Sequence, residues 1–254
     1  MAPVADRGPD AAIFRRRAEF SMRQPPTPFR RRAVEALADG GTVLDVGVGA
    51  GAGSLPLAPA ARLIVGVDRS ESMLREFRSC AEAFGISVCT VLGLWPQVAH
   101  TVDAVDVVIC HHVLYQVGDL PAFVEALASH ARRRVLIEMT TRHPQAWMAD
   151  LWLRFHGLER PTRPTSDDAE AALRELGLPV EREDHLLEMP PTGFAHREDA
   201  VTEVCERLCV PLERAPEVEA ALGDRLTLRE GLWSSFPPFE EVSTLWWDVE
   251  GATR

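Results

Sequence analysis

The sequence contains no lysine and no asparagine, so all 27 of its basic residues are arginines. Without lysine, the chain cannot carry out Schiff-base chemistry and has neither a phosphate-loop lysine nor a serine–lysine dyad. Acidic residues number 38, which gives a formal net charge of −11 at pH 7. Proteins that bind a nucleic-acid backbone present a dense basic face, so we predict that nucleic acid is not a partner.

Long apolar runs and paired cysteines are missing as well. No stretch reaches the roughly 18 unbroken apolar residues of a membrane span, and the N-terminus lacks the apolar centre of a secretory signal. The five cysteines show no CxxC spacing, so we predict neither disulfides nor a cysteine zinc site. We therefore expect a cytoplasmic protein without a membrane partner.

Short apolar strands alternate with helical stretches from residue 42 onward. Near-continuous Val, Ile and Leu runs are typical of parallel strands covered on both faces, and the alternation predicts a doubly wound α/β fold. One or two helices within 10–39, interrupted by the proline-rich stretch 24–28, precede it. The predicted strands are 42–46, 62–67, 86–92, 105–110, 134–138, 180–188 and 241–249. The predicted helices are 51–61, 71–84, 119–130, 144–158, 167–176, 196–209 and 216–222.

A glycine-rich turn follows the first predicted strand and reads Asp45-Val46-Gly47-Val48-Gly49-Ala50-Gly51. Glycines there allow a tight turn and a close approach of the backbone to a ligand. Asp68 ends the second strand, where a carboxylate would meet a ribose. The same glycines also fit a dinucleotide pattern, so a nicotinamide-dependent oxidoreductase is a rival interpretation.

Two features favour a different nucleotide cofactor. Asp45 stands two residues before the first glycine, where dinucleotide folds usually carry an apolar residue. Asp68 opens the stretch Asp-Arg-Ser-Glu-Ser-Met-Leu, which resembles the D-x-S-x-x-M-L stretch of class I S-adenosylmethionine-dependent methyltransferases, and residues 106–120 resemble the strand-four segment of the small-molecule members. The motif resemblance covers residues 42–138.

The resemblance implies a Rossmann-like, seven-stranded, mostly parallel sheet with an antiparallel last strand, N-terminal helices and a helical insertion after strand five. It implies one domain over 1–254, with an N-terminal helical lid (1–40), a cofactor-binding half (41–140) and a substrate-side half (141–254). The implied cofactor is S-adenosylmethionine.

Cofactor contacts carry over residue by residue. The resemblance implies that the glycine-rich turn binds the methionine part of the cofactor and that Asp68 binds the ribose. Leu94 stands where the family often has an acidic residue that binds the adenine. The cofactor-binding residues implied by the resemblance are Asp45, Gly47, Gly49, Gly51, Asp68, Arg69, Met73, Gly93, Leu94 and His111.

The sequence indicates the class of the methyl acceptor mainly through motifs that it lacks. The N/D-P-P-Y/F signature of amide-nitrogen methylation is absent after strand four, where Cys110-His111-His112-Val113 stands instead. Carboxylates of a metal-dependent catechol type are also absent there, so no metal site is predicted. We expect O- or N-methylation of a small organic molecule, with His111, His112 and Tyr115 as catalytic candidates. The sequence permits a homodimer without requiring one.

The sequence leaves two alternatives, one for the function of the glycine loop and one for a group of aromatic residues. A protein that binds S-adenosylmethionine without transferring its methyl group would carry the same loop. Trp147, Trp152 and Phe155 recur at near-helical spacing and form either an apolar lid over the acceptor or the packing face of an inserted helix.

Overall fold

The computed structural model describes residues 11–37 and 40–249. The chain divides into two compact units: unit 1 comprises residues 1–139, 169–185 and 242–254, and unit 2 comprises 140–168 and 186–241. The first break between the units lies next to the predicted boundary at 140/141, while the single-domain organisation stays a prediction. Residues 1–10 and 38–39 of the predicted lid lie outside the described residues.

Unit 1 is built around a sheet, and three strands (β5, β6 and β9) and one helix (α6) continue from it into unit 2. The helices are α1 (Ala11–Ser21), α2 (Pro28–Leu37), α3 (Glu71–Ala83), α4 (Leu120–His130) and α6 (Ser166–Glu175). The strands are β1 (Gly41–Val46), β2 (Ala61–Asp68), β3 (Val88–Leu92), β4 (Val105–His111), β5 (Ala131–Thr140), β6 (Glu181–Glu188) and β9 (Phe239–Asp248).

The seven strands lie in the order β3-β2-β1-β4-β5-β9-β6. Strands β1 to β5 pair in parallel. Strand β9 runs the other way, because the Thr141 amide donates to the Glu241 carbonyl and the Val249 amide donates to the Arg133 carbonyl. The predicted Rossmann-like sheet with an antiparallel last strand is confirmed.

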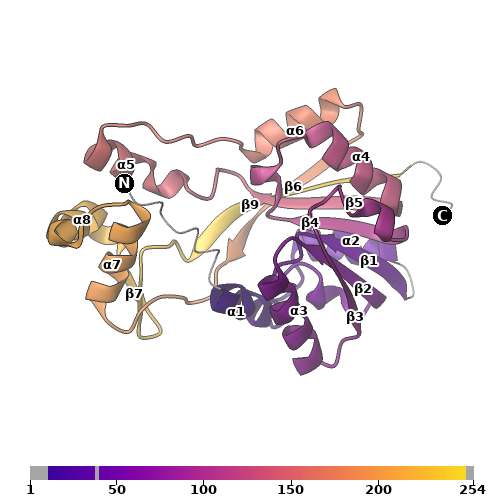
Figure 1. The fold of residues 1–254 in the computed structure, drawn as a ribbon, viewed down its shortest axis with the longest axis horizontal. Coiled ribbons are helices and arrows are strands. Elements are labelled where there is room, and N and C mark those ends of the chain that lie inside the picture. Colours follow the sequence, from indigo (N-terminus) through magenta and orange to yellow (C-terminus); the bar gives the residue numbers. More distant parts are fainter. Residues whose placement is uncertain (1–10, 38–39, 250–254) are drawn as a thin grey trace. The chain divides into compact units, whose positions relative to one another are not determined.

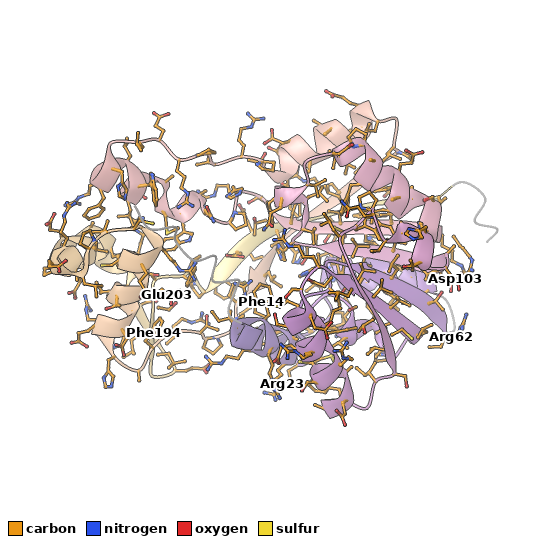
Figure 2. All side chains as sticks on the ribbon, viewed as in Figure 1. Phe14, Arg23, Arg62, Asp103, Phe194 and Glu203 are labelled. Carbon is orange, nitrogen blue, oxygen red and sulfur yellow. The ribbon has the colours of Figure 1, made fainter. Side chains whose placement is uncertain are left out.

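Alternating side chains give the sheet two buried faces. Leu44 and Val46 of β1 join the core that includes α4 and α6, whereas Val43 joins the core that includes α1, α2 and α3 (Figure 1). Figure 2 labels Arg62 and Asp103, which lie at the amino ends of β2 and β4 on one side of unit 1. The carboxyl ends of the parallel strands therefore share the other edge.

Unit 2 contains α5 (Ala149–His156), α7 (Arg197–Arg207), α8 (Ala215–Leu222) and the hairpin β7 (Thr227–Arg229) and β8 (Leu232–Ser234). Its helices share a core of its own, with buried residues such as Leu151, Val204 and Val218. Phe194, labelled in Figure 2, pairs with Trp233 through backbone hydrogen bonds. Trp147, Trp152 and Phe155 pack against this same core.

The predicted helix 51–61 is wrong. Turns and one short 3-10 helix, η1 (Leu55–Leu57), replace it. Gly51 adopts a φ of +89° there, which is incompatible with a right-handed helix.

Three smaller predictions in the second half of the chain also need correction. Residues 144–158 form the 3-10 helix η4 (Ala146–Met148) followed by α5, not one helix. The helix predicted over 167–176 begins one residue earlier, at Ser166. The β7–β8 hairpin was not predicted: Glu230 and Gly231, both with positive φ, form its two-residue turn. Within residues 11–37 and 40–249, no helix has the length and apolar character needed to cross a membrane.

Candidate active site

The glycine loop (residues 47–53) leaves the carboxyl end of β1 and is anchored to β2. The Gly47 and Val48 amides both donate to the Val67 carbonyl, at 2.8 and 3.0 Å. Gly47 has a φ of +77°, and a Cβ there would lie 2.3 Å from Cγ2 of Val113. Only glycine fits this close approach, so the loop has its turn because of the residue type.

Asp45 lies at the end of β1, directly before the glycine loop, and is 1% exposed. Among the described residues, neither of its carboxylate oxygens has a hydrogen-bond partner of ordinary geometry. The nearby Ser54 hydroxyl lowers the pKa of Asp45, but by less than burial raises it. Burial dominates and raises the pKa of Asp45 to about 6. A buried carboxylate without a donor is costly, so this group fits a positively charged ligand.

Asp68 connects the glycine loop to the end of β2. One carboxylate oxygen accepts from the Gly49 amide and the other from the Ser70 amide, both at 2.9 Å. Each oxygen keeps a further lone pair for a ligand hydroxyl. The Ser70 hydroxyl in turn caps α3 by accepting from the Met73 amide.

The remaining residues predicted for the adenine lie beside Asp68. The Gly93 amide donates to the Asp68 carbonyl at 2.9 Å, which holds the end of β3 against β2. The Arg69 side chain donates to Gln116 at 3.2 Å. Met73 is buried at the start of α3, and Leu94 is 48% exposed, so an apolar surface is available at this strand edge.

Helix α1 packs on the glycine loop. The Ser21 hydroxyl donates to the Ala52 carbonyl at 2.8 Å. Phe14, labelled in Figure 2, lies 3.4 Å from where a Cβ on Gly49 would be. The described part of the predicted lid is therefore in contact with the loop.

A buried ion pair joins β4 to β5 at the same strand edge. Nε2 of His111 lies 2.7 Å from Oε1 of Glu138, whose side chain is 2% exposed. Burial alone would lower the pKa of His111 and raise that of Glu138, but each charge stabilises the other, so the pKa of His111 is raised and that of Glu138 is lowered. Gly53 makes room for the imidazole, because a Cβ there would lie 3.0 Å from Cβ of His111.

His112 also turns towards Glu138. Successive side chains of a strand point to opposite faces, which predicts that one of two adjacent histidines packs away. The left-handed backbone of His112, at a φ of +61°, ends that alternation, and its Nε2 lies 4.0 Å from Oε1 of Glu138. Nδ1 of His112 lies 3.3 Å from the Tyr115 hydroxyl. Burial and the neighbouring His111 lower the pKa of His112 to about 3, so its ring is neutral.

Two further side chains from distant parts of the sequence complete this surrounding of Glu138. Nε2 of His185, from β6, lies 3.8 Å from the second oxygen, Oε2, and the Thr244 hydroxyl of β9 donates to that oxygen at 3.4 Å. Sequence reasoning missed Glu138 and His185. Glu138 stands as the only charged residue in an apolar run, and this signal could have identified it.

Each predicted site residue thus lies at or next to the carboxyl ends of β1 to β4. Their assignment as cofactor-binding or catalytic residues remains a proposal, since position alone does not show what they bind. Trp147, Trp152 and Phe155 belong to unit 2, where they pack on its core, and their role as a lid stays a prediction.

Comparison with known families finds a match to one segment of the chain. A family model described as a methyltransferase domain matches residues 43–134, which is less than half of the chain. The match spans β1 to β4 and the start of β5, including the glycine loop, Asp68 and both histidines. It confirms the predicted resemblance to class I methyltransferases and the cofactor, S-adenosylmethionine. No curated protein matches the chain.

Solved structures share the fold at low identity. The YcgJ protein of Bacillus subtilis is 18% identical, with a TM-score of 0.54 over 87% of this chain and 97% of that one. Protein BH2331 of Bacillus halodurans is 17% identical, with a TM-score of 0.55 over 87% and 96%. A precorrin 8w decarboxylase from Methanobacterium thermoautotrophicum is 14% identical, with a TM-score of 0.50 over 88% and 92%. At these identities the likeness shows the fold alone.

Proposed function

We propose that this protein transfers the methyl group of S-adenosylmethionine to a small organic acceptor, at an oxygen or nitrogen atom. The observation that carries the proposal is a pair of sites on one strand edge. The glycine loop begins beside the buried carboxylate of Asp45, which has no hydrogen-bond partner within residues 11–37 and 40–249, and the His111–Glu138 pair lies against Gly53 of the same loop.

The residues around the glycine loop would hold the cofactor. The carboxylate of Asp45 would receive the ammonium group of the methionine part, which removes the cost of a buried charge without a partner. Asp68 would accept the ribose hydroxyls on lone pairs that the Gly49 and Ser70 amides leave available. Arg69, Met73, Gly93 and Leu94 would surround the adenine.

The acceptor would lie on the histidine side of the loop. S-adenosylmethionine supplies a methyl group on a sulfonium, whose departure needs no acid, so the protein has mainly to align the acceptor and exclude water. An alcohol, a phenol or a protonated amine must also lose a proton. His111, paired with Glu138, and His112, beside Tyr115, are the groups that would bind such an acceptor and assist that loss.

Several properties of the whole protein belong to this proposal. The net charge of −11 supports a small molecule over nucleic acid as the acceptor. We also propose a cytoplasmic location and allow a homodimer.

Calorimetry distinguishes the cofactor alternatives. We expect S-adenosylmethionine and S-adenosylhomocysteine to bind and NAD not to bind. Asp68→Ala should weaken binding by about 10-fold or more, since two charge-assisted contacts to the ligand are lost. Asp103→Ala is the matched control, because Asp103 is exposed at the opposite edge of the sheet and its loss should leave affinity unchanged. Binding of NAD alone would refute the proposal.

Turnover separates catalysis from mere binding. The protein is incubated with S-adenosylmethionine and extracts of small molecules, and methylated products are detected by mass spectrometry. We expect a product that His112→Ala reduces strongly while affinity for S-adenosylhomocysteine changes little. Tight cofactor binding with no methylated product from any acceptor would favour a protein that binds the cofactor without transferring its methyl group.

A further inference from the structure

We propose that His111, His112 and Glu138, assisted by His185, form a binding site for a divalent transition-metal ion. The metal site itself does not depend on methyl transfer. Its role in holding the acceptor, given below, rests on the proposed function.

The spacing of the candidate ligand atoms suits one ion. One nitrogen of His111, one nitrogen of His112 and one oxygen of Glu138 all lie within 4.8 Å of one another. Metal–ligand bonds of about 2.0 to 2.1 Å in a tetrahedral site place neighbouring ligand atoms about 3.3 Å apart. The distances from Glu138 Oε1 to the two histidines, 2.7 and 4.0 Å, lie on either side of that value, so small side-chain rotations would suffice.

The backbone at His112 brings two consecutive side chains to one carboxylate. A regular strand would send them to opposite faces, but the φ of +61° at His112 redirects the second ring. The His112 amide also donates to the Glu138 carbonyl at 2.8 Å, which fixes the bend beside β5. Left-handed backbone at a residue other than glycine is uncommon and concentrates at functional sites.

His185 supplies an independent observation. Both of its ring nitrogens are buried and, within the described residues, neither has a hydrogen-bond partner. Nε2 lies 3.8 Å from Oε2 of Glu138, whereas His111 and His112 approach Oε1. Buried polar atoms normally have partners, and coordination of an ion at Glu138, directly by His185 or through a water, would provide one.

The ligand types select the ion. Two or three imidazoles with one carboxylate suit Zn²⁺, Fe²⁺ or Co²⁺, whereas Mg²⁺ and Ca²⁺ prefer oxygen ligands. No metal site was predicted from the sequence, because the segment after strand four has no clustered carboxylates. The carboxylate comes instead from β5, and β6 adds the third histidine.

Incomplete coordination by protein would give the ion a function. Three protein ligands leave at least one position for an outside donor. The side chains of His111 and His112 are 19% and 26% exposed, so a ligand can reach them. An acceptor with a hydroxyl or other metal-binding oxygen would be held there, and the ion would lower the pKa of that hydroxyl. The proposed acceptor class is therefore a metal-binding alcohol or phenol.

The test uses the full chain after treatment with a chelator. Calorimetry with Zn²⁺ should show one site with a dissociation constant below about 1 µM, and Mg²⁺ should give no comparable binding. Co²⁺ should produce visible absorption bands of a protein-bound ion. Glu138→Gln and His112→Ala should each weaken Zn²⁺ binding by about 100-fold or more, and His185→Gln by about 10- to 100-fold. His100→Ala, an exposed histidine outside the cluster, is the control and should leave the site unchanged.

Binding of S-adenosylhomocysteine is measured on the same samples and shows whether each variant is folded. The inference is overturned if wild type binds no stoichiometric Zn²⁺, or if the folded Glu138→Gln and His112→Ala variants bind it as wild type does. Cofactor binding without Zn²⁺ binding would refute the metal site and leave the proposed function standing. Zn²⁺ binding without cofactor binding would do the reverse.

Discussion

The buried carboxylate of Asp45 should lower the stability of the ligand-free protein and strengthen cofactor binding, and both effects can be measured. Burial raises its pKa from 3.8 to about 6 in the folded protein. A raised pKa means that this group favours the folded state fully below about pH 3.8, and that the contribution is lost as pH rises through about 6. Each pKa unit corresponds to about 1.4 kcal/mol, so ionised Asp45 costs the ligand-free protein roughly 3 kcal/mol at neutral pH.

Asp45→Asn removes the charge and keeps the shape. Relative to wild type, the variant should gain up to roughly 3 kcal/mol in free energy of unfolding at pH 8 and only about 1 kcal/mol at pH 4.5. Urea unfolding at both pH values measures the difference, in which contributions from the other titrating groups cancel. The same variant should lose about 10-fold or more in affinity for S-adenosylhomocysteine, because the cofactor's ammonium loses a charged acceptor.

Asp106→Asn is the control with the opposite sign. Burial alone would raise the pKa of Asp106. The Thr42 amide and hydroxyl, which donate to its carboxylate at 2.7 and 2.9 Å, outweigh burial and lower the pKa. Its stabilising contribution is present at neutral pH and lost on acidification, so Asp106→Asn should destabilise at pH 8 and less so at low pH. The reasoning about Asp45 fails if Asp45→Asn is less stable than wild type at pH 8, or if its advantage does not grow with pH.

Two further predictions concern the backbone turn and unit 2. Thermal unfolding should show that Gly47→Ala costs about 2 to 4 kcal/mol of stability, since it adds the close contact with Val113 to the strain of positive φ. Gly85 is the control: it has a φ of +68° with open space around it, so Gly85→Ala should cost only about 1 kcal/mol. His156→Ala removes a 2.6 Å contact with the carbonyl that follows α7. It should speed hydrogen exchange in α5 and α7 by up to about 5-fold, corresponding to about 1 kcal/mol, without changing cofactor affinity; a change in affinity with unchanged exchange would contradict it.

The local pattern of the sequence was enough for the cofactor half. Runs of Val, Ile and Leu predict buried parallel strands, and the glycines after β1 together with Asp68 at the end of β2 predict the ligand edge. These signals are local, since each depends on a few consecutive residues and on strand or turn chemistry. The prediction failed at residues 51–61, where turns and the short 3-10 helix η1 stand in place of a helix and Gly51 has a positive φ.

The histidine cluster depended on tertiary structure. Glu138 reaches His111 because β5 lies beside β4, and His185 reaches Glu138 because the antiparallel β9 places β6 in the same sheet. A strand order is set by packing of the whole domain, and sequence spacing carries no record of it. Likewise, strand alternation predicts that His112 turns away, and only the left-handed backbone reverses that direction. The sequence by itself therefore determined the glycine loop and the position of Asp68, where we propose that the cofactor binds, because a loop is a local feature. The fold decided which side chains surround Glu138, because they come from separate strands.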